Sequence, residues 1–280
     1  DQVVLKKLDL KISNGTNLEK WSSFVDRLKF PKNKIKIGLI GKYVELQDSY
    51  KSILESLIHA GSENETQVEV VSIHSEFIDE KQIKNEICKL DGVLVAPGFG
   101  SRGIEGKIEA IKCAREENIP FFGICLGMQM AVIEFSRNIL GLKDANSTEM
   151  DENTPHPVIA LMENQKNITK KGGTMRLGSW ECKIESNSKV SEIYKSEIIS
   201  ERHRHRWELN DNYRDELNKK GLKSCGTNPE TGLVEIIELS SNDWFIGVQF
   251  HPEYKSTVEC PHPLFVSFVK ACLNYKKSKN

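Results

Sequence analysis

A cysteine between two glycines is the side chain of this sequence best placed to act as a nucleophile. Gly123-Ile124-Cys125-Leu126-Gly127 follows an apolar run of strand length, 119–124, and precedes a segment, 126–135, whose apolar residues recur at helical spacing. A strand-turn-helix of this kind holds a nucleophile above a sheet, and small flanking residues permit the sharp bend. The free N–H groups at a helix N-terminus also favour a thiolate. The pattern predicts a reactive cysteine at position 125.

A histidine at the end of a second apolar run is the candidate base. The run 244–250 has the composition of a strand, and His251-Pro252-Glu253 follows it. Pro252 ends the strand, and the spacing lets Glu253 orient the imidazole of His251. A single buried cysteine is usually an inert apolar residue and a single histidine is usually structural. Together, the two motifs predict a relay of Cys125, His251 and Glu253.

These motifs resemble those of the class I, triad-type, glutamine amidotransferases. The resemblance extends from about residue 35 to residue 270, and it is narrower than that class, because five further stretches are similar to the glutaminase domain of the CTP synthase family. These are Gly41-Lys42-Tyr43 followed by Asp48-Ser49-Tyr50, Gly98-Phe99-Gly100-Ser101-Arg102-Gly103, Asp144-Ala145-Asn146-Ser147-Thr148-Glu149, Gly173-Thr174-Met175-Arg176-Leu177-Gly178, and Glu201-Arg202-His203-Arg204-His205-Arg206.

The resemblance implies further site residues. It implies oxyanion donors from the N–H groups of Gly98 and Leu126. This chain has Ala96-Pro97-Gly98 where the family usually has Pro-Gly-Gly, and Pro97 lacks an N–H, so Gly98 is the donor expected from that loop. The resemblance also implies that Glu149 faces the α-ammonium group of the substrate and that Arg206 binds its α-carboxylate. The implied substrate-binding set is Gly98, Leu126, Gly127, Met128, Gln129, Glu149 and Arg206.

The implied activity is hydrolysis of L-glutamine to glutamate and ammonia, with no cofactor and no metal in this domain. An amino-terminal synthetase domain, absent from this chain, would use ATP and Mg²⁺ to aminate UTP to CTP. GTP would activate the glutaminase, with the loop of Arg102 as a participant, and the full-length enzyme would be a homotetramer. The alternatives are another class I amidotransferase, a γ-glutamyl hydrolase, or an inactive glutaminase-like assembly module.

Alternating apolar patterns predict the fold. From 35 to 135 the order is strand, helix, repeated four times, which indicates an α/β fold with a mainly parallel central sheet and helices on both faces. A glycine-rich loop, 97–103, lies where parallel strands end, the edge at which such sheets place ligands. An antiparallel extension is expected from strands at 157–162, 174–184 and 198–209 and from a hairpin over 222–239.

The chain divides into three predicted parts. Residues 1–33 form a linker with one helix, in which Leu18, Trp21, Phe24, Val25 and Leu28 follow a possible cap at Asn17. Residues 34–275 form the amidotransferase domain, with a polar irregular loop at 138–153 and another loop at 164–173. Residues 276–280 form a disordered tail.

Charge and composition exclude several classes of protein. Lys and Arg number 39 against 40 Asp and Glu, a net charge of −1, so no basic field favours nucleic acid. The cluster at 202–206 is short and alternates as a strand does, and its two histidines lack a third metal ligand. Gly41-Lys42-Tyr43 lacks the spacing of a phosphate loop.

Cysteine usage and hydropathy predict the compartment. The seven cysteines include no Cys-x-x-Cys pair and are expected to be reduced thiols. No apolar run approaches 18 residues and no signal-peptide pattern is present, so a cytoplasmic protein without membrane attachment is expected. The first residue is Asp1 and not Met, which suggests a piece of a longer or processed protein.

Overall fold

A mixed sheet forms the centre of the molecule. The computed structural model describes residues 2–10, 18–76, 80–161 and 175–279. Within these residues the main sheet has nine strands, which in spatial order are β2 (Thr66–His74), β1 (Asn33–Gly41), β3 (Gly92–Val95), β4 (Phe121–Ile124), β12 (Phe245–Val248), β11 (Val234–Leu239), β10 (Leu222–Thr227), β7 (Arg176–Ile184) and β8 (Ile198–His205). Neighbours from β2 to β12 are parallel, and neighbours from β12 to β8 are antiparallel. The predicted parallel core with an antiparallel extension is confirmed.

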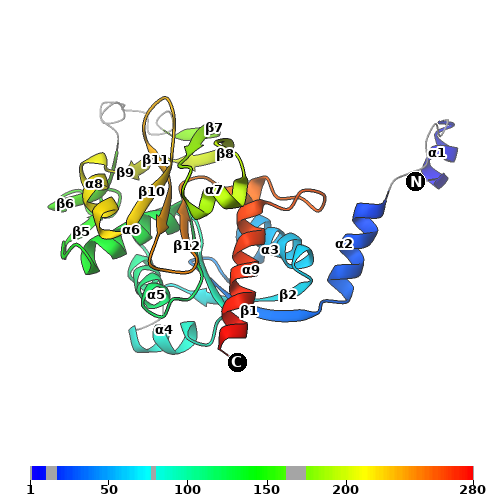
Figure 1. Cartoon of the computed structure of the whole chain (residues 1–280), viewed down its shortest axis with the longest axis horizontal. Helices are drawn as coiled ribbons and strands as arrows, with labels where there is room; N and C mark the ends of the chain where they lie inside the picture. Colours follow the sequence, from blue (N-terminus) through cyan, green and yellow to red (C-terminus); the bar gives the residue numbers. More distant parts are fainter. Residues whose placement is uncertain (1, 11–17, 77–79, 162–174, 280) are drawn as a thin grey trace.

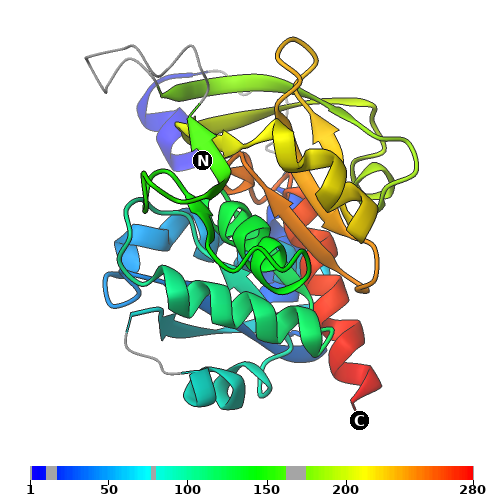
Figure 2. The same cartoon turned by 90° about the vertical axis from the view of Figure 1, so that its left-hand side faces the viewer.

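Helices cover both faces of the parallel half. On one face lie α3 (Lys51–Glu63) and α9 (Pro263–Ser278), and on the other lie α4 (Glu80–Ile87), α5 (Ile104–Glu116) and α6 (Leu126–Asn138) (Figures 1 and 2). Adjacent side chains of β4 enter opposite layers, because Phe121 packs with the α5 and α6 side and Phe122 contacts Phe265 and Phe268 of α9. All residues of β3, β4 and β12 are buried, as expected for strands covered twice.

A smaller sheet corrects one prediction. It contains β5 (Ala145–Ser147), β6 (His156–Leu161) and β9 (Trp207–Leu209). The loop predicted over 138–153 is therefore wrong at 145–147, because Ala145 and Ser147 are buried and β5 pairs with β6. The strand predicted over 198–209 is interrupted at Arg206, so its two parts, β8 and β9, belong to different sheets. The short helices α7 (Lys189–Tyr194) and α8 (Asp211–Lys220) were not predicted.

The amino-terminal segment contains α1 (Gln2–Lys7) and α2 (Glu19–Lys29), and α2 is the helix expected there. Phe24 is buried against α3, where Ser62 Oγ donates a hydrogen bond to its carbonyl oxygen at 3.2 Å. The opposite side of α2 is open, and Trp21 is 47% exposed. Asn17 and the predicted loop 164–173 lie outside the described residues.

The disordered tail predicted over 276–280 is wrong as far as Ser278, since α9 continues to that residue. Lysine side chains hold this end of the helix. Lys276 Nζ donates to the Lys34 carbonyl at 2.7 Å and lies 3.6 Å from the Asp91 carboxylate. Lysines in a last helical turn also complement the helix dipole. None of the described helices is both long and apolar enough to cross a lipid bilayer.

Candidate active site

Cys125 occupies the predicted sharp turn between β4 and α6. Its backbone has φ 52° and ψ −103°, a conformation unusual for a side-chain-bearing residue. Only glycine fits at the two flanking positions, because a side chain there would clash with the backbone. A Cβ atom on Gly127 would lie 2.2 Å from the Val95 carbonyl oxygen, and one on Gly123 would lie 2.8 Å from the Gly127 carbonyl group. Strain concentrated at a nucleophile is typical of functional turns.

His251 follows the end region of β12, and Glu253 lies in the short 3-10 helix Pro252–Tyr254. His251 Nδ1 lies 2.7 Å from Glu253 Oε1. This hydrogen bond to the carboxylate fixes Nδ1 as a ring nitrogen that carries a proton. Nε2 is buried and has no hydrogen-bond partner. The imidazole also stacks on the Tyr254 ring, with centroids 5.1 Å apart. This arrangement leaves one ring nitrogen available to a reacting group.

The sheet brings the two motifs together. β4 and β12 are parallel neighbours in which Ile124 pairs with Val248, and Cys125 N donates to the Val248 carbonyl at 2.7 Å. Both chains therefore leave the sheet at the same edge. Burial lowers the pKa of His251, but the negative charges of nearby Cys125 and Glu253 and the hydrogen bond to Glu253 outweigh it and raise that pKa to about 11. The imidazolium is the protonation state of His251 that these contacts favour.

The glycine-rich loop lies over the start of α6. A Cβ atom on Gly98 would be 3.5 Å from the Leu126 side chain, so the loop residue and the first residue of α6 are neighbours. Leu126 is the first residue of α6, so its N–H has no partner within the helix. Lys42 Nζ donates to the Phe99 and Gly100 carbonyl oxygens at 2.5 and 2.8 Å and so anchors the loop.

Glu149, one of the predicted substrate-binding residues, contacts the same loop, and Arg206, another, lies within its electrostatic reach. Glu149 Oε1 accepts a hydrogen bond from Gly100 N at 2.7 Å. Burial raises the pKa of Glu149, against the opposing effects of this hydrogen bond and of the positive charges of Lys42 and Arg206. Arg206 follows the end of β8, and its Nε is buried without a hydrogen-bond partner. Arg206 lies near enough to Glu149 for its positive charge to act on that carboxylate.

Gln129 is held by two acceptors. Its Nε2 donates to the Trp207 carbonyl at 2.9 Å and to Gln249 Oε1 at 3.1 Å, so both amide hydrogens are used. Gln249 Nε2 in turn donates to Cys125 Sγ at 3.7 Å. Met128 and Gly127, the remaining predicted residues, are buried in the first turn of α6, where Gly127 brings the helix against β3.

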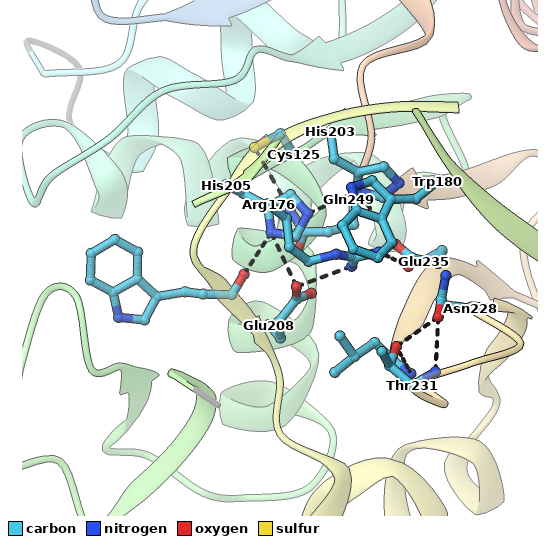
Figure 3. A network of polar contacts seen from close by, with 12 residues as sticks. Cys125, Arg176, Trp180, His203, His205, Glu208, Asn228, Thr231, Glu235 and Gln249 are labelled. Carbon is cyan, nitrogen blue, oxygen red and sulfur yellow. Dashed lines mark hydrogen bonds and ion pairs between the residues drawn. The ribbon is translucent and has the colours of Figure 1, made fainter. Parts of the chain in front are cut away.

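A buried ionic network lies behind the nucleophile (Figure 3). Arg176 bridges Glu208 at 3.1 Å and Glu235 at 2.8 Å. His203 Nδ1 and His205 Nε2 are 2.9 Å apart, and His205 Nδ1 lies 3.3 Å from the Trp207 carbonyl. Burial, with help from nearby positive charge, lowers the pKa of His203 to about 2 and that of His205 to about 3, so both imidazoles are neutral. Burial raises the pKa of Glu208 to about 8.

The structure confirms the alternation predicted for the Arg-His cluster within β8, in which His203 and His205 face inward and Arg202 and Arg204 outward. Arg204 lies over the Phe99 ring of the glycine-rich loop, with its guanidinium 5.8 Å from the ring centroid. Arg102, on the same loop, lies 3.5 Å from Glu76 and over the Tyr43 ring. Within the described residues, no three His, Cys, Asp or Glu side chains gather as a metal site would require.

Sequence reasoning missed Lys107 and Gln249, and it missed the role of Lys42 in anchoring the glycine-rich loop. Lys107 is fully buried, and its Nζ donates to the Ala96 carbonyl at 2.8 Å, below the glycine-rich loop. Burial and the charge of Lys42 lower its pKa to about 7. A lysine in the middle of an apolar helical pattern was the available signal for Lys107, and nothing local marked Gln249.

Comparison with known proteins agrees with this geometry. The model of the class-I glutamine amidotransferase family matches residues 45–271. The CTP synthases of Flavobacterium johnsoniae and Christiangramia forsetii are each 64% identical to the chain, over 99% and 100% of its length. The chain covers 52% of each, so it spans about half the length of these curated relatives.

A solved structure extends the likeness to three dimensions. The glutaminase domain of Trypanosoma brucei CTPS, solved with bound acivicin, matches with a TM-score of 0.81 and 38% identity, over 86% of this chain and 94% of that one. A GMP synthase subunit from Thermoplasma acidophilum, at 15% identity and a TM-score of 0.56, shares the fold. The chain therefore belongs to the class I glutamine amidotransferases and, within them, to the glutaminase domains of the CTP synthase family.

Proposed function

We propose that this chain hydrolyses L-glutamine to glutamate and ammonia by nucleophilic catalysis. The observation that carries the proposal is the parallel pairing of β4 and β12, which brings Cys125 beside an imidazole whose Nδ1 is fixed by Glu253 and whose Nε2 is free. A nucleophile, a base and a group that orients the base are the three parts that thiol-based acyl transfer requires.

In the first half-reaction, the Cys125 thiolate attacks the side-chain amide carbon of glutamine. The C–N bond breaks as the His251 imidazolium gives its proton to the leaving nitrogen, so ammonia departs and a glutamyl thioester remains. In the second half-reaction, neutral His251 takes a proton from water, and the resulting attack on the thioester releases glutamate and restores the thiolate. The N–H groups of Gly98 and Leu126 stabilise the oxyanion in both steps.

The charges around the loop suit free glutamine better than a peptide. Glu149 pairs with the α-ammonium group and Arg206 with the α-carboxylate, and a peptide lacks both charges at an internal residue. Gln129 has both amide hydrogens engaged, which leaves its Oε1 as the acceptor for the carboxamide N–H of the substrate. Gly127 and Met128 complete the predicted pocket through the first turn of α6.

We propose that the full-length protein, and not this chain alone, uses the ammonia. Lys42 does not fit a phosphate site, because its Nζ is buried and bonded to two loop carbonyl oxygens. Because the chain spans only 52% of the length of its CTP synthase relatives, we place the binding of ATP, Mg²⁺ and UTP in an amino-terminal synthetase domain beyond this chain, where UTP would be aminated to CTP. Activation by GTP, a homotetramer and a cytoplasmic location remain predictions.

The test compares two nitrogen sources in the full-length protein. Wild type should form CTP from UTP with either glutamine or ammonium chloride. Cys125→Ala should lose glutamine-dependent CTP formation by about 10³-fold or more and keep ammonium-dependent formation. Lys51→Ala, an exposed change on α3, is the matched control and should resemble wild type.

The outcomes separate the alternatives. Glutamine hydrolysis without transfer of ammonia to UTP would indicate a γ-glutamyl hydrolase or an amidotransferase with another acceptor. Failure of wild type to hydrolyse glutamine with all nucleotides present, together with failure of Cys125 to react with a diazoketone analogue of glutamine, would indicate an inactive assembly module.

A further inference from the structure

We propose that Gln249 is a further catalytic residue, whose side-chain amide donates a hydrogen bond to the Cys125 sulfur and stabilises its thiolate. The inference rests on the proposed function, because it concerns the nucleophile of that reaction. Gln249 lies just after β12, two residues before His251, so the strand that supplies the base also supplies this donor. Gln249 is fully buried and Cys125 is only 3% exposed.

The contact joins the side-chain amide to the reacting atom. Gln249 Nε2 lies 3.7 Å from Cys125 Sγ, a normal separation for an N–H donor and a large sulfur acceptor. Figure 3 shows Gln249 between the Cys125 sulfur and the buried network of Arg176. Both side chains are buried, and a hydrogen bond in such a low-dielectric site is stronger than in solvent.

The contact of Gln249 Oε1 with Gln129 determines which way round the Gln249 side-chain amide lies. Gln249 Oε1 accepts from Gln129 Nε2 at 3.1 Å, and the second hydrogen of that group is bound to the Trp207 carbonyl. A flipped Gln249 amide would place its NH₂ group against the NH₂ group of Gln129 and its oxygen against the sulfur. Both contacts would then be repulsive, so the donor faces Cys125.

The buried network holds this chain of hydrogen bonds in place. Gln249 N donates to the Glu235 carbonyl at 2.8 Å, and the Glu235 carboxylate is bound by Arg176. The Trp207 carbonyl, which fixes Gln129, also lies 3.3 Å from His205 Nδ1. Because His205 is neutral, that nitrogen carries a hydrogen and its Nε2 accepts from His203. The donor to the sulfur is thus positioned before substrate binds.

The effect of the Gln249 hydrogen bond on the reaction depends on the charge of the Cys125 sulfur at each step. The thiolate is negative before attack, becomes neutral in the thioester and is negative again when glutamate leaves. A fixed N–H donor stabilises the two charged states and contributes little to the thioester. Gln249 therefore aids formation of the thiolate and its departure in the second half-reaction.

The experiment measures the Cys125 thiolate directly in the full-length protein. Wild type, Gln249→Met and Gln249→Glu are treated with iodoacetamide from pH 5 to 10, and alkylation of the Cys125 peptide is followed by mass spectrometry. Gln249→Met has a similar length and no donor. Its alkylation rate at pH 7 should fall about fivefold, in line with the loss of one buried hydrogen bond, and its pH profile should move to higher pH.

Gln249→Glu places a carboxylate beside the sulfur and should slow alkylation at pH 7 further than Gln249→Met does. Gln67→Met, on the exposed side of β2, is the matched control and should match wild type. Both Gln249 variants should lower kcat for glutamine hydrolysis more than they raise KM. Unfolding curves in urea identify a variant that fails to fold, and the other variant then carries the test.

A folded Gln249 variant with the wild-type alkylation profile would overturn the inference and leave the proposed function intact, provided that wild type hydrolyses glutamine. A wild type that neither hydrolyses glutamine nor alkylates faster at Cys125 than at the exposed Cys260 would instead overturn the proposed function.

Discussion

Burial alone does not distinguish Cys125 from the other cysteines. Cys113, Cys182, Cys225 and Cys272 are also buried, and burial raises the pKa of each thiol. These four lie in the two apolar core layers, where a raised pKa keeps the thiol protonated and inert. Cys125 alone combines a strained turn, a helix N-terminus, a histidine and an amide donor. Its environment, and not its side chain, makes it the candidate nucleophile.

Glu149→Gln tests how the substrate's α-ammonium group is recognised. Glutamine keeps an oxygen that can accept from Gly100 N, so the loop contact is retained while the charge is removed. We expect KM for L-glutamine to rise about 10- to 100-fold, the value of one charge-assisted hydrogen bond, with a smaller change in kcat. Steady-state kinetics of the full-length protein measure both constants.

An analogue of glutamine that lacks the α-amino group supplies the control for this variant. Because it has no charge to pair, wild type and Glu149→Gln should use it equally well. Glu152→Gln, an exposed change on the same segment, should leave both constants unchanged. An equal loss on the two substrates would show that Glu149 acts through the loop and not through the ammonium group.

The turn from β4 into α6 is built by close backbone contacts. Gly127 lies directly against β3, where its Cα approaches the Val95 carbonyl so closely that no Cβ fits. This approach sets the distance between α6 and the sheet and hence the height of Cys125 above the strand ends. The glycines of the motif are thus explained by packing as well as by the turn.

Gly127→Ala should therefore destabilise the fold. The added Cβ would lie 2.2 Å from backbone atoms that cannot rotate away, and overpacking of this kind costs about 3 kcal/mol. Gly98→Ala is the matched control for stability, because its Cβ would meet only ordinary contacts at 3.5 and 3.8 Å. Urea unfolding measures both changes, and equal midpoints for Gly127→Ala and wild type would show that α6 moves freely.

Local pattern explains which elements the sequence predicted well. β4, α6 and β12 have strong apolar periodicity and glycine or proline at their ends, so their place and type were predictable. α7, α8 and β5 are short or polar, and tertiary contacts decide their structure. The interruption of the strand at Arg206 was also missed, because the alternation of residue types in the sequence continues through this position. In the structure β8 and β9 nevertheless belong to different sheets.

The active site depends on a long-range arrangement. Cys125 and His251 meet only because β12, after an excursion through the antiparallel half, inserts beside β4 in parallel. The alternation of apolar segments predicts a parallel sheet and leaves the order of its strands open. The pairing of the two motifs predicted that Cys125 and His251 meet, and the order of the strands that brings them together is known only from the structure. A residue without a local pattern, such as Gln249, becomes visible only in the folded arrangement.

Lys107 links this arrangement to the stability of the whole domain. Its amine is fully buried, and burial lowers its pKa from 10.5 to about 7. Between these two values the unfolded chain binds a proton that the folded chain does not, so the contribution of Lys107 to stability rises with pH from about 7 to 10.5. Below pH 7 the amine is charged in both states and its burial is most costly.

Lys107→Met should remove this dependence on pH. Relative to the variant, the free energy of unfolding of wild type should increase by about 2 kcal/mol between pH 7 and pH 8.5, since each pH unit in this window contributes about 1.4 kcal/mol. Urea unfolding of both proteins at the two pH values measures the double difference, in which other titrating groups cancel. Lys51→Met removes an exposed lysine and controls for net charge. Parallel behaviour of wild type and Lys107→Met would show that the buried amine keeps the same charge throughout, and Lys107 would then support the glycine-rich loop as a permanent cation.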